Sequence, residues 1–233
     1  MWYTIPNLTP KGDRPMKYGE STFDILYLLF AIVAGCVMLA KARCRTEKLM
    51  GLAALILGCG DAFHLVPRVL HYFIDGDFTM ALGLGKLVTS LTMTVFYVLL
   101  YAIWQGDYRE ARSRGLTALI ILLTACRFAL CALPQNGWLQ NSSDVTWGIL
   151  RNVPFVVLGG LVCLLYCRNR RLAPRFAPVW VYILLSFLFY IPVAVAASLL
   201  PILGMLMLPK TVCYILLIVT FLQAVLKDPV RAE

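Results

Sequence analysis

Seven apolar stretches, each about 18–26 residues long, occupy most of this 233-residue chain. Each stretch is long enough to cross the hydrocarbon core of a bilayer as one helix. A bilayer offers the backbone no water as a hydrogen-bond partner, so apolar stretches of this length must form helices there. Hydrophobic residues make up 61% of the sequence and charged residues only 14%. We therefore predict an all-α, polytopic membrane protein built as a seven-transmembrane-helix bundle.

The expected domain boundaries follow from these stretches. Residues 1–22 are mixed and polar and lack the uninterrupted apolar core of a signal peptide, so we expect an outer N-terminal segment there. Residues 23–226 form the transmembrane domain, and residues 227–233 form a cytoplasmic tail. The predicted spans are 23–40, 49–73, 79–104, 116–133, 147–166, 179–200 and 206–226.

The net charge of +9 is explained by topology and not by nucleic-acid binding. Basic connectors alternate with connectors that lack lysine and arginine, which is the positive-inside pattern. It predicts that the N-terminus lies outside and the C-terminus inside. We expect the chain to lie in the cell membrane (plasma or inner). Topology accounts for thirteen of the 21 basic residues: Lys41, Arg43, Arg45, Lys48, Arg109, Arg112, Arg114, Arg168, Arg170, Arg171, Arg175, Lys227 and Arg231.

Five further cations lie inside the predicted spans. On the insertion scale, each costs about 2.5–3.5 kcal/mol at the centre of a span. The helical rise of about 1.5 Å per residue places all five in the outer half of the bilayer. We expect them to surround a water-filled cavity open to the outside, where clustered positive charge attracts an anion. These cations are Arg68, Lys86, Arg127, Arg151 and Lys210.

The second span adds an ionisable stripe. Its four members point the same way within an arc of roughly 80°, and Asp61 is the one deep acid. Polar side chains on neighbouring spans suit the same cavity, although such hydroxyls also serve as packing partners. Arg151 and Lys210 lie close enough to the outer interface to snorkel. The stripe is Asp61, His64, Arg68 and His71, and the added polar candidates are Ser90, Tyr97, Asn152, Tyr190 and Tyr214.

Metal and retinal sites are disfavoured. His64 and His71 lie about 10 Å apart along one helix, too far to share an ion. Lys210 stands on the last span, as a retinal lysine does, but near its outer end and with no acid evident on the third span. Asp61 has a simpler alternative role as an ion-pair partner of Arg127 or Lys86. We therefore expect no metal and no cofactor.

Residues 60–68, Gly-Asp-Ala-Phe-His-Leu-Val-Pro-Arg, resemble the Gly-Asp segment of the lysoplasmalogenase family of polytopic membrane proteins. Residues 81–97 and, more weakly, 207–217 are similar to helices of that family. The resemblance implies an acid/base role for Asp61 in cleaving a vinyl-ether lipid, with His64 as a polar partner. The family uses acids from more than one helix, whereas here only Asp61 is expected to be buried. Ser90 or nearby threonines replace the histidine of the family's next helix.

These patterns lead to one leading function and one alternative. The leading expectation is recognition of an anionic small molecule or lipid headgroup by a receptor or transporter. The alternative is a lysoplasmalogenase-like enzyme with Asp61 and His64 as catalytic residues, and a purely structural role is the third option. Two partners fit this arrangement: a cytoplasmic protein that docks on the basic connectors, and a second copy of the chain. We expect no nucleic-acid partner.

Overall fold

The computed structural model describes residues 13–107, 113–141, 145–196 and 200–227, which are mostly helical and contain no strand. The seven long helices are α1 (Asp13–Lys41), α2 (Arg45–Phe73), α3 (Thr79–Asp107), α4 (Arg114–Ala132), α5 (Val145–Asn169), α6 (Val179–Ala196) and α7 (Met207–Lys227). Short 3-10 helices lie in the connections: η2 (Pro134–Asn136), η3 (Trp138–Gln140), η4 (Pro174–Phe176) and η5 (Pro201–Leu206).

All seven long helices are long and apolar enough to cross a membrane, which confirms the predicted seven-span bundle. By this measure the chain is an integral multi-pass membrane protein. The last residue of α2 and the first residue of α3 fall where the sequence predicts them, at Phe73 and Thr79.

The first helix is longer than predicted. It begins at Asp13, ten residues before the expected span, and the part of it that could cross a membrane runs from Lys17 to Lys41. The added turns carry Glu20, which shares one face with Asp24 and Tyr27 at spacings of four and three. That face is buried in the bundle, while Leu26 and Leu29 on the other side are more than half exposed. Charged residues are therefore tolerated in this span because they face other helices.

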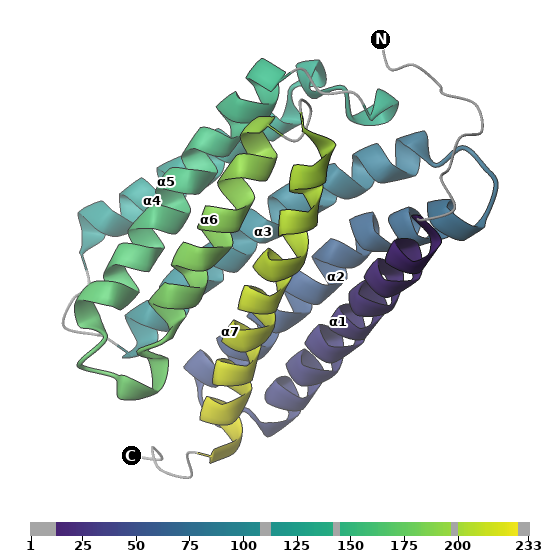
Figure 1. Cartoon of the computed structure of the whole chain (residues 1–233). Coiled ribbons are helices and arrows are strands. Elements are labelled where there is room, and N and C mark those ends of the chain that lie inside the picture. Colours follow the sequence, from purple (N-terminus) through teal and green to yellow (C-terminus); the bar gives the residue numbers. More distant parts are fainter. Residues whose placement is uncertain (1–12, 108–112, 142–144, 197–199, 228–233) are drawn as a thin grey trace.

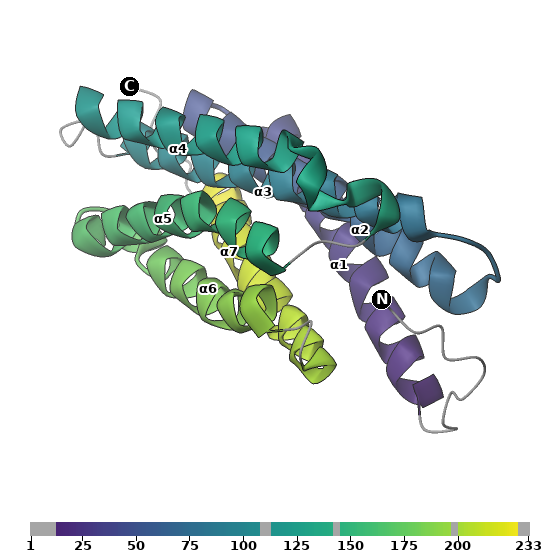
Figure 2. The same ribbon diagram turned by 90° about the horizontal axis from the view of Figure 1, so that it is seen from above.

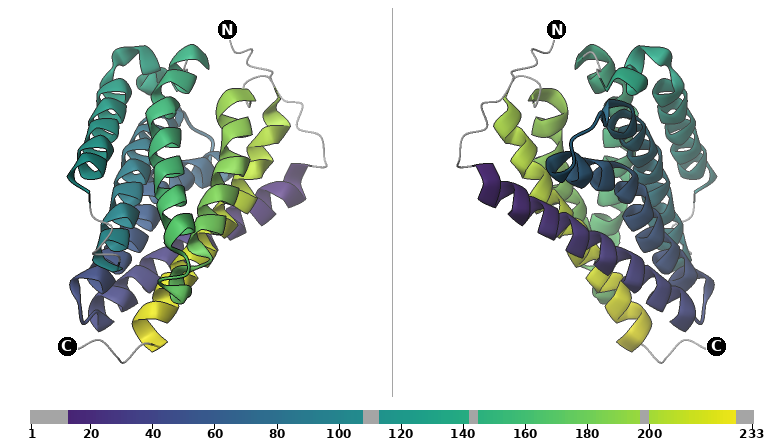
Figure 3. Two further views of the ribbon diagram at one scale, coloured as in Figure 1. Left: turned by 90° about the vertical axis from the view of Figure 1, so that its left-hand side faces the viewer. Right: turned by 90° about the vertical axis from the view of Figure 1, so that its right-hand side faces the viewer.

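The helices alternate in direction around a ring in which each packs on its chain neighbours and α7 returns to α1 and α2 (Figure 1). Seen from above, α1 to α4 form one layer and α5 to α7 cover it (Figure 2). Two further side views show α1 and α7 crossing at a wide angle (Figure 3). We call the end where α1 begins the N-terminal end of the bundle. It also holds the connections α2–α3, α4–α5 and α6–α7 (Figure 1).

Glycines bring α2 and α3 into close contact near that end. A Cβ atom built on Gly85 would lie 2.2 Å from the carbonyl oxygen of Phe63 and 2.8 Å from Cα of His64. One built on Gly60 would lie 2.1 Å from the hydroxyl of Thr92. Only glycine permits this approach, which places His64 of α2 beside the first turns of α3.

The connection between α2 and α3 ends in a local cap. The backbone N–H of Thr79, the first residue of α3, donates to the carboxylate of Asp77 at 2.9 Å. Hydrogen bonds from Thr79 hold the pKa of the exposed Asp77 carboxyl below its usual value. A negative charge at this position also complements the partial positive charge at the start of the helix.

Candidate functional site

Polar and charged side chains from all seven helices gather in the half of the bundle nearest its N-terminal end. Since successive helices run in opposite directions, the starts of α1, α3, α5 and α7 meet the ends of α2, α4 and α6 there. We call this group the polar cluster. Its members are Glu20, Asp24, Tyr27, Asp61, His64, Arg68, Tyr72, Lys86, Arg127, Arg151, Asn152, Tyr190 and Lys210.

Asp61 is held by a phenol from another helix. The Tyr27 hydroxyl of α1 donates to Oδ2 of Asp61 at 2.7 Å, and Tyr27 itself is fully buried. Asp61 is half-buried, and its charge interacts with that of Lys210 on α7. The structure records no direct ion pair between these two described residues. The neutral Tyr27 hydroxyl thus orients the Asp61 carboxylate, and the charge of Lys210 acts on that carboxylate without direct contact.

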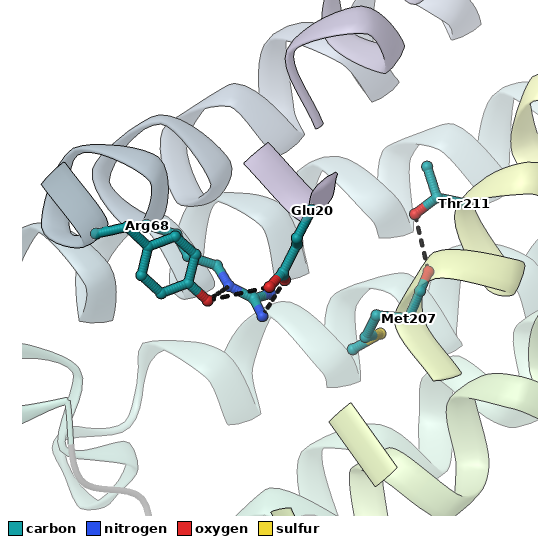
Figure 4. Close-up of polar contacts among 5 residues, drawn as sticks. Glu20, Arg68, Met207 and Thr211 are labelled. Carbon is teal, nitrogen blue, oxygen red and sulfur yellow. Dashed lines mark hydrogen bonds and ion pairs between the residues drawn. The ribbon is translucent and has the colours of Figure 1, made fainter. Parts of the chain in front are cut away.

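Arg68 has its own acid partner. Its guanidinium pairs with Glu20 of α1, and its Nε donates to the Tyr72 hydroxyl at 3.1 Å (Figure 4). Tyr72 in turn donates to Glu20 at 3.2 Å, which closes a triangle between α1 and α2. The sequence singled out Arg68 but missed Glu20 and Tyr72, because a partner on another helix leaves no local pattern.

Asp24 is a second buried acid. It is only 5% exposed, so the expectation that Asp61 is the only buried acid is wrong. One of its carboxylate oxygens is buried and accepts no hydrogen bond within the described residues. Its charge interacts with those of Arg68, Glu20 and Asp61. The signal that could have revealed it is the shared face of Glu20, Asp24 and Tyr27.

Arg127 is the most deeply buried cation, at 2% exposure. Its Nη1 donates to the carbonyl oxygen of Arg151 at 2.7 Å and to Oδ1 of Asn152 at 3.0 Å. Its guanidinium carbon lies 4.2 Å from the ring centre of Phe155. Tyr190 of α6 donates to the same Asn152 oxygen at 2.8 Å. These contacts join α4, α5 and α6 through neutral acceptors.

Arg151 and Lys86 are held by the connection between α4 and α5. Arg151 donates to Oδ1 of Asn136 at 2.9 Å, and its guanidinium lies 4.3 Å from the Trp138 ring centre. Lys86 Nζ donates to Oδ1 of Asn141 at 2.8 Å. These three connection residues were not predicted as partners.

Lys210 has aromatic neighbours instead of a hydrogen-bond acceptor. Its Nζ lies 4.8 Å from the ring centre of Tyr190 and 5.5 Å from that of Tyr214. Within the described part of the chain, its ammonium donates no hydrogen bond and forms no ion pair. Its charge interacts with those of Asp61 and Arg127.

Three predicted residues have other surroundings. Tyr97 is fully buried, with its hydroxyl 3.4 Å from that of Ser186 and 3.5 Å from that of Tyr214. Ser90 donates to the carbonyl of Lys86 in its own helix at 2.8 Å, which indicates a packing role. His71 is exposed, and its ring packs edge-on against Phe78 at 5.9 Å.

The cations are electrostatically coupled to one another. Interactions run from Arg68 to Lys86, from Lys86 to Arg151, from Arg151 to Arg127 and from Arg127 to Lys210. His64 interacts with both ends of this series, with Arg68 and Lys86 on one side and Lys210 on the other. Its Nδ1 is buried and has no hydrogen-bond partner among the residues placed by the structure. Each of the five cations therefore interacts electrostatically with at least one other.

The described residues contain no group of three or more His, Cys, Asp or Glu side chains placed to hold a metal ion. All eight cysteines are free thiols. No family model, curated protein or solved structure matches this chain.

Proposed function

We propose that this membrane protein binds an anionic small molecule or lipid headgroup at the polar cluster, as a receptor or transporter whose N-terminal end faces outside. The observation that carries this proposal is the charge imbalance of the cluster. Five cations from five helices share the cluster with three carboxylates, and within the described part of the chain only Arg68 among the five forms an ion pair.

Neutral acceptors hold three of the other cations without neutralising them. Asn152, Asn136 and Asn141 supply amide oxygens to Arg127, Arg151 and Lys86 respectively. An amide oxygen satisfies an N–H group but brings no negative charge. Like charges 4 Å apart repel by about 4 kcal/mol at an effective dielectric of 20, and the repulsion falls as distance increases. A bound anion relieves that repulsion, which is why such clusters favour anions.

The surroundings of each cation suggest which groups meet the ligand. Both Arg127 and Arg151 already donate to protein acceptors and stack on aromatic rings. The Lys210 ammonium and the buried Nδ1 of His64 have no hydrogen-bond partner within the described residues, although the ammonium lies beside the Tyr190 ring. An anion would therefore meet the lysine and the imidazole first, before the arginines, although a free guanidinium can bind phosphate through two parallel hydrogen bonds.

Neutralising the lysines tests anion binding. Lys86→Gln and Lys210→Gln are each expected to weaken the binding of inorganic phosphate and of lysophosphatidate by about tenfold, which corresponds to about 1.4 kcal/mol. Binding is measured as the concentration dependence of the thermal shift of the purified chain. The matched control is Lys48→Gln, an exposed lysine at the opposite end of the bundle.

The two probes separate the ligand sources. A response to lysophosphatidate alone points to a lipid headgroup, whereas a response to both points to a site for phosphate itself. The proposal fails if the wild-type chain responds to neither probe, or if both lysine variants respond as Lys48→Gln does.

Thiol labelling tests the orientation. Asp75 is exposed in the connection between α2 and α3, and Cys44 is exposed at the opposite end of the bundle. In intact cells, an impermeant maleimide is expected to label the Asp75→Cys variant at residue 75 but to spare Cys44 until the cells are lysed. Peptide mapping locates the label. Labelling of Cys44 before lysis, with residue 75 protected, would reverse the proposed orientation.

One observation favours the enzyme of lysoplasmalogenase type as a second candidate. The resemblance implies acids from more than one helix, and Asp24 of α1 supplies a second buried carboxylate whose charge interacts with that of Asp61. Tyr27 orients Asp61, and His64 stands one turn further along α2. Release of aldehyde from a vinyl-ether lysolipid by the wild-type chain, lost in Asp61→Asn with lysolipid binding retained, would favour the enzyme.

A further inference from the structure

Asp24 of α1 carries a buried carboxyl group that no other side chain contacts through a hydrogen bond. Asp24 is only 5% exposed, and its Oδ2 has no hydrogen-bond partner among the residues that the structure describes. Ser21 lies one turn earlier on the same face and is 4% exposed, and its hydroxyl has no partner there either. Buried polar groups are rarely left unsatisfied, and an ionisable one inside a membrane span points to a functional role.

The cations on this face of α1 are engaged with other residues. The guanidinium of Arg68 pairs with Glu20, one turn before Asp24, and its Nε donates to the Tyr72 hydroxyl. Lys17 lies on the same face of α1, and its Nζ is 5.8 Å from the ring centre of Tyr72. The charge of Arg68 acts on Asp24 as well, but Asp24 forms no ion pair within the described part of the chain. Its carboxyl group is therefore buried without a cation in contact.

A second carboxylate lies on the same side of α1, further from the N-terminal end. Tyr27, three residues after Asp24, donates to Oδ2 of Asp61 at 2.7 Å, which brings Asp61 of α2 to the face that carries Asp24. The other helix that packs on α1 is α7, and its cation Lys210 acts on Asp61. Two neighbouring carboxylates repel each other when both are ionised. An unpaired carboxylate in an apolar interior is costly enough that the group takes up a proton instead.

We propose that Asp24 is a proton-binding site, at which one proton resides on the carboxyl group near neutral pH while Glu20 and Asp61 stay ionised. Glu20, whose side chain is 20% exposed, connects this face of α1 to the water at the N-terminal end. Binding moves one proton from that water to the Asp24 carboxylate and breaks no bond of the protein. Rows of carboxyl groups inside membrane spans carry protons in pumps and transporters. The site goes beyond anion binding and does not depend on it.

Infrared spectroscopy of the full chain in detergent micelles tests this proposal. A protonated carboxyl group has a C=O stretching band that is separate from the bands of ionised carboxylates and of the backbone. Near neutral pH, the wild-type chain is expected to show this band, and isotopic labelling of the aspartate carboxyl carbons is expected to shift it. Asp24→Asn is expected to remove the band. Asp77→Asn is the matched control and is expected to keep it, because Asp77 is exposed and ionised.

A second variant keeps the test decisive where Asp24→Asn fails to fold. Asp24→Glu retains a carboxyl group and is expected to keep the band but to make it insensitive to aspartate labelling. The proposal is overturned by a wild-type chain without the band, by a band that aspartate labelling does not shift, or by a band that persists unchanged in folded Asp24→Asn. Loss of the wild-type band when sodium replaces choline in the buffer would overturn it in favour of a metal cation. No phosphate is present in these samples, so a failure of anion binding leaves the result unaffected.

Discussion

Replacing Gly85 by alanine is expected to destabilise the bundle by about 3 kcal/mol, at the upper end of the range for overpacking. The added Cβ would lie 2.2 Å from the carbonyl oxygen of Phe63 and 2.8 Å from Cα of His64. Both are backbone atoms of α2, so no side-chain rotation relieves the overlap. The helices α2 and α3 must move apart, which loosens the packing that places His64 beside the start of α3.

Two glycines of α5 provide matched controls for this substitution. A Cβ built on Gly148 or Gly160 meets no atom within 4 Å. Alanine at either position is expected to be neutral or to stabilise by up to about 1 kcal/mol, because alanine favours helix more than glycine does. Unfolding is followed by titration with sodium dodecyl sulfate in mixed micelles. A Gly85→Ala variant as stable as the two controls would show that α2 and α3 are not in close contact there.

The spans could be predicted from the sequence because the bilayer imposes both their length and their apolarity. The start of α1 could not, since residues 13–22, with Glu20 among them, are polar and were assigned to an outer segment. Glu20 and Asp24 lie within the helix because Arg68 on α2 interacts with both of them across the bundle. That compensation is tertiary and has no signature within α1 alone.

In the candidate site, the approach of the cations to one another could be predicted from the sequence, but their partners could not. Helical depth and alternating direction predict that Arg127, Arg151 and Lys210 approach one another, and their charges do interact. The partners Asn136, Trp138 and Asn141 were missed because they lie in a connection whose path depends on packing against α3. Their acceptor and ring contacts form only once that connection is folded onto the helices.

Arg127→Ala is expected to cost about 2–4 kcal/mol of stability, measured by the same detergent titration. A hydrogen bond from a charged donor contributes about 1.5–3 kcal/mol, and truncation of a large buried side chain adds a cavity. Reduced repulsion of Arg151 and Lys210 offsets part of this cost. Arg114→Ala is the matched control: Arg114 stands exposed at the start of the same helix, and its loss is expected to change stability by no more than about 0.5 kcal/mol.

A double-mutant cycle separates the hydrogen-bond network from the cavity. Asn152→Ala removes the acceptor shared by Arg127 and Tyr190, so combining it with Arg127→Ala should cost less than the sum of the single changes. A coupling of about 1 kcal/mol or more is expected for groups in direct contact. Purely additive effects would mean that the Asn152 acceptor adds nothing to the contribution of Arg127, which would then stabilise the bundle through its bond to the Arg151 carbonyl and its packing against Phe155.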